Sequence, residues 1–92
     1  MHTNKLLCLL MVILILSTEG FKKRELAIRS QKIPVWVTSN VLTKRQIEKY
    51  RKEGFNLTVF DHTIDHTNKK LLDQKIEMIK LHHPGQTVTV HI

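Results

Sequence analysis

The chain has 92 residues, which is enough for one small domain. Cys8 is its only cysteine, so a fold held together by intrachain disulfides is excluded. Lysine and arginine number 15 against 8 aspartates and glutamates, and the net charge is +7. A positive charge of this size indicates an anionic partner, such as lipid headgroups, nucleic acid or an acidic protein, without choosing among them.

The chain opens with an apolar run. Lys5 is followed by eleven apolar residues without a charge, at positions 6–16. A membrane span needs about 20 apolar residues, and residues 17–20 bring the run close to that length. The run also fits the apolar part of a secretory signal, with a cleavage point after Gly20. We therefore predict an N-terminal apolar helix in residues 1–20, serving as a signal-anchor or as a cleaved signal peptide.

Basic residues follow the apolar run, and residues 21–32 are interpreted as a basic linker. Lys22, Lys23 and Arg24 are the candidates for contact with a membrane surface. Because basic residues tend to stay on the cytoplasmic side of a membrane, the preferred prediction is an uncleaved anchor with a cytoplasmic C-terminal domain. The alternative is a small secreted protein, released by cleavage near Gly20.

Three segments of the remaining chain, 33–92, have the pattern of strands. Residues 33–38 are apolar on both alternating faces, which is typical of a strand buried on both sides. Residues 57–60 form a second short run of this kind. Residues 87–92 alternate strictly between apolar and polar, which predicts a strand with one buried face.

Two segments between these strands have the pattern of helices. Thr43 and Gln46 fit a capping box, and Gly54 fits the left-handed residue that ends a helix. The second helix is expected to start at Thr67 or Asn68, which are both good caps. Its buried face would carry Leu72, Ile76 and Ile79.

The alternation of strands and helices predicts an α/β fold: a small βαβαβ domain with a three-stranded parallel sheet after the apolar helix. In the order 2-1-3, the strand at 33–38 lies in the centre and one helix covers each face. This order is preferred because residues 33–38 are the most apolar on both sides.

A polar repeat follows the second predicted strand, since Asp-His-Thr occurs at 61–63 and again at 65–67. Parallel strands end at one edge of their sheet, and ligands of open α/β sheets bind outside that edge. Residues 38–40, after the first strand, should reach the same edge. The candidate ligand residues are Ser39, Asn40, Asp61, His62, Asp65 and His66. A loop that caps the next helix is the simpler interpretation of the repeat.

Signals for catalysis and for cofactors are weak in this sequence. His62 and His66 are weak metal candidates, because their spacing matches no known metal motif. Ser39 lacks a nucleophile elbow, and the three glycines form no phosphate-binding loop. We predict no catalytic residue and no cofactor, and an enzymatic or metal-binding domain ranks last among the alternatives.

The preferred function is that of a membrane-tethered, non-enzymatic binding or regulatory module. Residues 6–20 would anchor the protein in the membrane, and the carboxyl edge of the sheet would bind a protein or a small ligand. Nucleic acid is disfavoured, although left open, because Trp36 and Phe60 are expected in the core rather than on a stacking platform.

Overall fold

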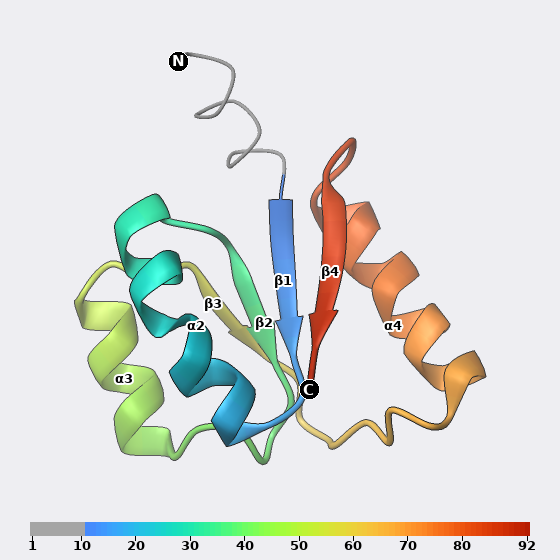
Figure 1. The fold of residues 1–92 in the computed structure, drawn as a ribbon, viewed down its shortest axis with the longest axis horizontal. Coiled ribbons are helices and arrows are strands. Elements are labelled where there is room, and N and C mark those ends of the chain that lie inside the picture. The colour runs from blue at the N-terminus through green and yellow to red at the C-terminus, as the bar shows by residue number, and fades with distance from the viewer. Residues whose placement is uncertain (1–10) are drawn as a thin grey trace.

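The computed structural model describes residues 11–92 of the chain. In these residues strands and helices alternate from the first element to the last (Figure 1). The elements are β1 (Met11–Ile15), α2 (Thr18–Gln31), β2 (Val35–Val37), α3 (Lys44–Lys52), β3 (Leu57–Val59), α4 (Lys69–His82) and β4 (Thr87–His91).

The strands form one parallel sheet in the order β3-β2-β1-β4. β1 is an inner strand, and its Leu14 is level with Trp36 of β2 on one side and with Val90 of β4 on the other. α2 and α3 cover one face of the sheet and α4 covers the other, so the domain has three layers (Figure 1). This arrangement confirms the α/β class and the parallel sheet predicted from the alternation of elements.

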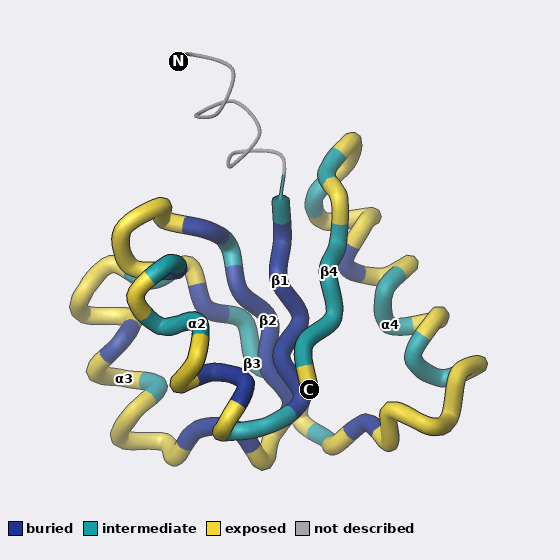
Figure 2. Tube along the Cα trace, in the orientation of Figure 1, coloured by how far each residue is buried: buried dark blue, intermediate teal, exposed yellow. Residues whose placement is uncertain are grey.

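Each face of the sheet has its own hydrophobic core. Ile13 and Ile15 of β1 point toward α2 and α3, where they join Phe21 and Tyr50. The alternate residues Val12 and Leu14 point toward α4 and pack in a second cluster with Trp36, Phe60 and Ile79. β1 is therefore buried on both faces (Figure 2), which explains why its sequence lacks any polar alternation.

The predicted number and order of strands are wrong. The sheet has four strands, because residues 11–15 contribute β1. The predicted neighbours 33–38 and 57–60 do pair, as β2 and β3. The predicted contact between 33–38 and 87–92 is replaced by β1, which pairs with both β2 and β4.

The expected N-terminal apolar helix is not supported in the described part of residues 1–20. Met11–Ile15 is a strand, and α2 starts only at Thr18. Residues 1–10 of the expected helix lie outside the described residues. Within residues 11–92, no helix has the length and hydrophobicity needed to cross a membrane.

Residues 21–32, interpreted as a basic linker, belong almost entirely to α2. Ser17 caps this helix by accepting a hydrogen bond from the amide of Gly20, and Lys32 ends it in the left-handed conformation. Phe21 and Ile28 are buried against the sheet, while most of the basic side chains between and after them are exposed.

The two helices expected from the sequence begin where their caps predict. Thr43 and Gln46 form both bonds of the capping box at the start of α3. Gly54 follows the helix with a φ of 96°, a conformation that favours glycine. Of the two candidate caps of α4, Asn68 makes the capping bond, through its Oδ1 to the amide of Leu71.

Candidate functional site

The carboxyl ends of the four strands meet at one edge of the sheet, at the arrowheads in Figure 1. α2, α3 and α4 all begin at this carboxyl edge, because each follows a strand that ends there. The strand order reverses between β1 and β4. The loop that borders this switch point is therefore residues 16–18, which no sequence signal marked as a site.

The switch point itself is closed by the chain. The amide of Gly20 donates a hydrogen bond to Ser17 Oγ at 3.0 Å and is therefore already bonded. Gly20 is buried, and a methyl group on its Cα would lie 3.3 Å from the backbone carbon of Ile92. The end of β4 thus packs on the first turn of α2, where an open α/β sheet often holds its ligand.

Asn40 and its neighbours join the ends of β1 and β2. The hydroxyl of Thr38 donates to Asn40 Oδ1 at 2.6 Å, and Asn40 Nδ2 donates to the carbonyl of Leu16 at 3.4 Å. The amide side chain of Asn40 therefore has structural partners on both of its atoms. Ser39 is bonded through its backbone, because its amide donates to the carbonyl of His62. The residue itself is exposed.

The first half of the Asp-His-Thr repeat pairs an exposed aspartate with a half-buried histidine. His62 Nδ1 lies 2.7 Å from Asp61 Oδ1, and the hydrogen bond from His62 lowers the pKa of the Asp61 carboxyl. The imidazole packs on the ring of Phe60, with 5.5 Å between ring centroids. The Ser39 bond and the Phe60 contact hold His62 beside the end of β2.

The second half of the repeat is a turn that leads into α4. Asp65 Oδ1 accepts hydrogen bonds from the hydroxyl of Thr67 at 2.7 Å and from its amide at 2.9 Å. Both bonds lower the pKa of Asp65, and the bond from the hydroxyl has the larger effect. Asp65 thus has the structural role of a capping loop, and His66 beside it is exposed.

The histidines of the repeat are not part of a metal-ligand cluster in residues 11–92. The structure brings together no group there of three His, Cys, Asp or Glu side chains with the geometry of a metal site. His82 and His83, at the end of α4, instead lie against Trp36.

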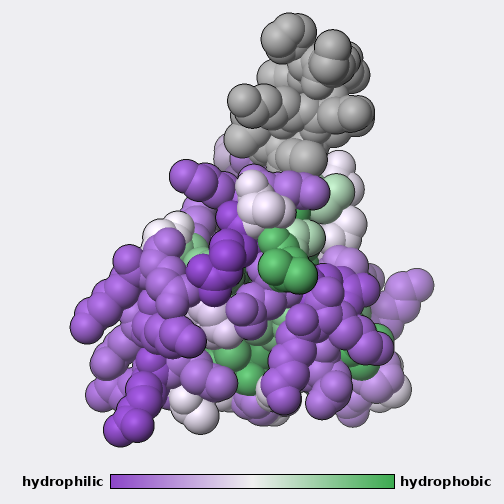
Figure 3. All heavy atoms as spheres, turned by 60° about the vertical axis from the view of Figure 1, so that its left-hand side comes forward, coloured by the Kyte–Doolittle hydropathy of each residue, from purple (hydrophilic) through white to green (hydrophobic). Residues whose placement is uncertain are grey.

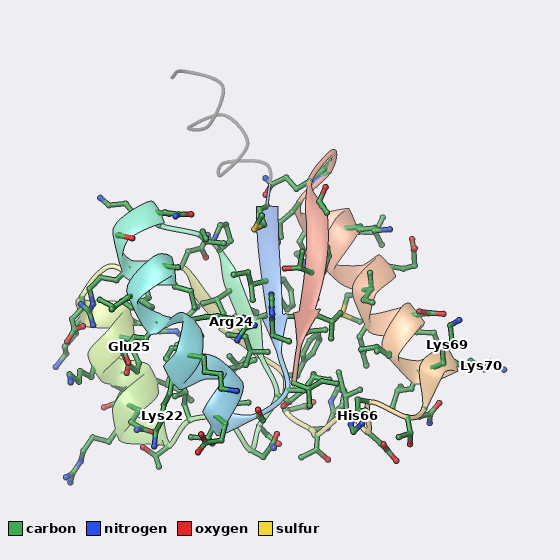
Figure 4. The ribbon with its side chains drawn as sticks, in the orientation of Figure 1. Lys22, Arg24, Glu25, His66, Lys69 and Lys70 are labelled. Atoms are coloured by element: carbon green, nitrogen blue, oxygen red, sulfur yellow. The ribbon has the colours of Figure 1, made fainter. Side chains whose placement is uncertain are left out.

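Two pairs of cations stand at the carboxyl edge, at the starts of two helices that lie on opposite faces of the sheet. α3 starts with Lys44 and Arg45, α4 starts with Lys69 and Lys70, and neither first turn contains an acidic residue. Figure 4 places Lys22, His66, Lys69 and Lys70 at this end of the domain. No site was predicted at these first-turn cations, although Thr-Lys-Arg at 43–45 and Asn-Lys-Lys at 68–70 show a cap followed directly by two cations.

The predicted membrane-surface residues lie in the first half of α2. Lys22 and Lys23 are exposed. The face of the molecule that Figure 3 turns forward is mostly hydrophilic. Arg24 turns back toward the helix start, with Nη1 3.5 Å from the carbonyl of Gly20. Lys22 lies toward the carboxyl edge, whereas Met11 starts β1 at the opposite edge of the sheet (Figure 4).

Comparison of the chain with protein-family models, with curated proteins and with solved structures gives no match. The geometry of the carboxyl edge is therefore the basis of the functional argument.

Proposed function

We propose that this protein is a non-enzymatic binding module whose carboxyl edge takes a ligand with several phosphate groups. The observation that carries the proposal is the charge at the starts of α3 and α4. Each helix places two cations in its first turn and no acid.

That placement works against the stability of the helices. The amino end of a helix carries a partial positive charge, so a cation there is unfavourable by a few tenths of a kcal/mol up to about 1 kcal/mol. Acidic residues would stabilise both helices, yet Lys44, Arg45, Lys69 and Lys70 stand there instead. Charges that oppose local stability are expected at functional sites, and free helix amides and cations both attract phosphate.

Asp61, Asp65 and Glu19 also lie at this edge, and the lowered pKa values of Asp61 and Asp65 keep both carboxyls charged. The four first-turn cations of α3 and α4, together with Lys22, outnumber these three acids. Ser39 and His66 are exposed at the same edge and offer further donors. Trp36 and Phe60 are buried and give no stacking platform, so recognition would rest on charge.

Calorimetric titration of the full chain with inorganic tripolyphosphate tests the proposal. Binding should weaken as salt is added, because exposed charges are screened. Replacing Lys69 and Lys70 by Gln, or Lys44 and Arg45 by Gln, should weaken binding on the order of tenfold, since each close pair of unlike charges contributes about 1 kcal/mol.

The matched control removes the same charge from the far end of α3, through Lys49→Gln with Lys52→Gln. This variant should bind like the unaltered chain. Sedimentation with vesicles that contain or lack anionic phospholipid distinguishes a headgroup from a soluble phosphate ligand. Absence of binding to both probes, or equal losses in the control and the edge variants, would overturn the proposal.

Attachment to a membrane through residues 6–20 stays a separate proposal. Met11–Ile15 of this segment form β1, so an anchor that includes them would withdraw an inner strand from the sheet. Because β1 starts at the amino edge of the sheet, an anchor confined to the residues before Met11 would leave the carboxyl edge facing away from the bilayer. Protease protection of a tag after Ile92 in sealed vesicles tests this topology and its cytoplasmic orientation. A tag reachable only from the exterior would contradict it.

The alternative of export after cleavage near Gly20 conflicts with this fold. Such a cut would remove β1 and the cap of α2, and β1 is the strand that joins β2 to β4. An exported product starting at Phe21 would therefore need a different fold.

A further inference from the structure

The two edges of the sheet are built differently. β3 has three residues, and its Leu57 carbonyl accepts hydrogen bonds from Arg51 Nε at 3.2 Å and Nη2 at 3.1 Å. The Asn56 carbonyl accepts from Val35 of β2, so the next carbonyl along the strand points away from the sheet. Arg51 thus occupies the outer side of β3 and hinders further strand pairing.

Among the described residues, no hydrogen bond of this kind covers the outer side of β4. It runs for five residues, Thr87–His91, and pairs with β1 at every position. Its sequence, Thr-Val-Thr-Val-His, contains neither the lysine nor the proline that natural edge strands use against further pairing. Within residues 11–92, no strand pairs with the outer side of β4.

The direction of the backbone groups on β4 follows from one hydrogen bond. The carbonyl of His91 accepts from Leu16 at 2.9 Å and therefore points toward β1. Because backbone groups alternate in direction along a strand, the amides and carbonyls of Val88 and Val90 point outward. These four groups form a pairing edge with no partner among the described residues.

We infer that β4 pairs with β4 of a second copy of this chain, antiparallel about a two-fold axis at Thr89. In this register Val88 of one copy exchanges both backbone bonds with Val90 of its partner, and Val90 does so with Val88. Thr89 of one copy lies opposite Thr89 of the other, in the closely spaced type of antiparallel pair that exchanges no backbone hydrogen bonds. Of the two-fold registers, the one centred on Thr89 uses all five residues of the strand.

The side chains suit this self-pairing. Val88 and Val90 already pack on the core beneath α4, so a facing pair of valines extends that core across the dimer. On the other face Thr89 would meet Thr89 and Thr87 would meet His91, and cross-strand pairs of β-branched residues are favourable. Burial and the charge of Arg24 lower the pKa of His91, which keeps charge off this strip at neutral pH.

The self-complementary register at Thr89 favours a second copy as the occupant, and charge does not oppose a copy along the strand itself. Two chains with a charge of +7 repel each other over most of their surfaces. β4 is a strip of five residues without lysine or arginine, so like charges do not meet along it. The dimer should therefore strengthen as salt screens the remaining repulsion, which is the opposite of the salt effect expected for phosphate binding.

Sedimentation velocity on the full chain tests the pairing. We expect a dimer whose fraction rises with protein concentration and with salt. Thr89→Lys places two like charges opposite each other on the axis and should give a folded monomer. Thr58→Lys, the matched change on β3, should leave the dimer intact, and circular dichroism checks that both variants fold.

A disulfide trap tests the register. In a Cys8→Ser background, Thr89→Cys should form a covalent dimer on mild oxidation, because the close antiparallel pair has a Cα separation of about 4.5 Å, which a disulfide can span. Thr58→Cys in the same background should remain monomeric on a denaturing gel. A chain that stays monomeric at high salt, a folded Thr89→Lys variant that still dimerises, or equal cross-linking at both positions would overturn the inference.

Discussion

The indole nitrogen of Trp36 donates a hydrogen bond to Nε2 of His83, over a distance of 3.2 Å. Trp36 lies on β2 and only 6% of it is exposed, while His83 follows the last turn of α4. The ring of His82 meets the same indole edge-on, with 5.5 Å between centroids. These contacts tie the end of α4 to the inner strand β2, across 47 residues of sequence.

Replacing His83 by Phe should lower the free energy of unfolding by about 1–3 kcal/mol, because the buried indole N–H loses its acceptor. Urea unfolding followed by the fluorescence of the only tryptophan measures this directly. His83→Gln keeps an acceptor and should recover part of the loss. Equal stability of the Phe and Gln variants would show that the bond contributes nothing.

Tyr50 should ionise at an unusually high pH. Its pKa is raised from 10.0 to about 12, first by burial and then by the bond to Glu25, whose Oε1 lies 2.7 Å from the phenolic oxygen. The folded state favours the protonated phenol, so its stabilising contribution is complete below pH 10.0 and is lost as the pH rises toward about 12.

Absorbance at the phenolate band follows this titration cleanly, since Tyr50 is the only tyrosine. Glu25→Gln removes the negative charge beside the phenol and should lower the pKa of Tyr50, although burial would keep it above the ordinary value. An unchanged titration in this variant would contradict the assigned role of Glu25.

A chain that begins at Phe21 should fail to fold, because it lacks β1. Residues Val12, Leu14 and Ile15 are almost fully buried, and losing even one such leucine side chain costs about 2–5 kcal/mol. Circular dichroism and urea titration would reveal the loss as an absent cooperative transition. A chain that begins at Met11 keeps β1 and is the matched control. Cooperative unfolding of the Phe21 chain would refute the central place of β1.

Asn68→Ala should destabilise the domain by about 1 kcal/mol, because the first turn of α4 loses its cap. Thr67→Ala should destabilise the domain less than Asn68→Ala, because the Thr67 hydroxyl donates its hydrogen bond to Asp65 and does not cap a helix amide. Thermal unfolding of both variants compares them. A larger loss in Thr67→Ala would identify the turn, and not the cap, as the stabilising element.

The sequence by itself determined much of the chain after residue 33. Local signals placed α3 between its capping box and Gly54, and α4 after Asn68. These signals are readable because caps act within one helical turn. The alternation of elements then implied parallel strands, and the pairing of β2 with β3 followed from it.

Part of the candidate site was also visible in the sequence. Asp61 and Asp65 precede α4 at the carboxyl edge as expected, and Asp65 does form the turn that enters the helix. The position of the switch point could not be derived, because it depends on β1. The first-turn cations of α3 and α4 acquire meaning only when both helix starts lie at the same edge.

Only the tertiary structure decided that Met11–Ile15 is a strand. A continuous apolar run looks the same in sequence whether it forms a strand buried on both faces or a membrane helix. Its conformation is fixed by partners far along the chain, since β1 bonds with β2 at Val35–Val37 and with β4 at Thr87–His91. The backbone groups of an inner strand are hydrogen-bonded by the neighbouring strands and not by residues nearby in sequence. The local sequence pattern therefore does not reveal the pairing.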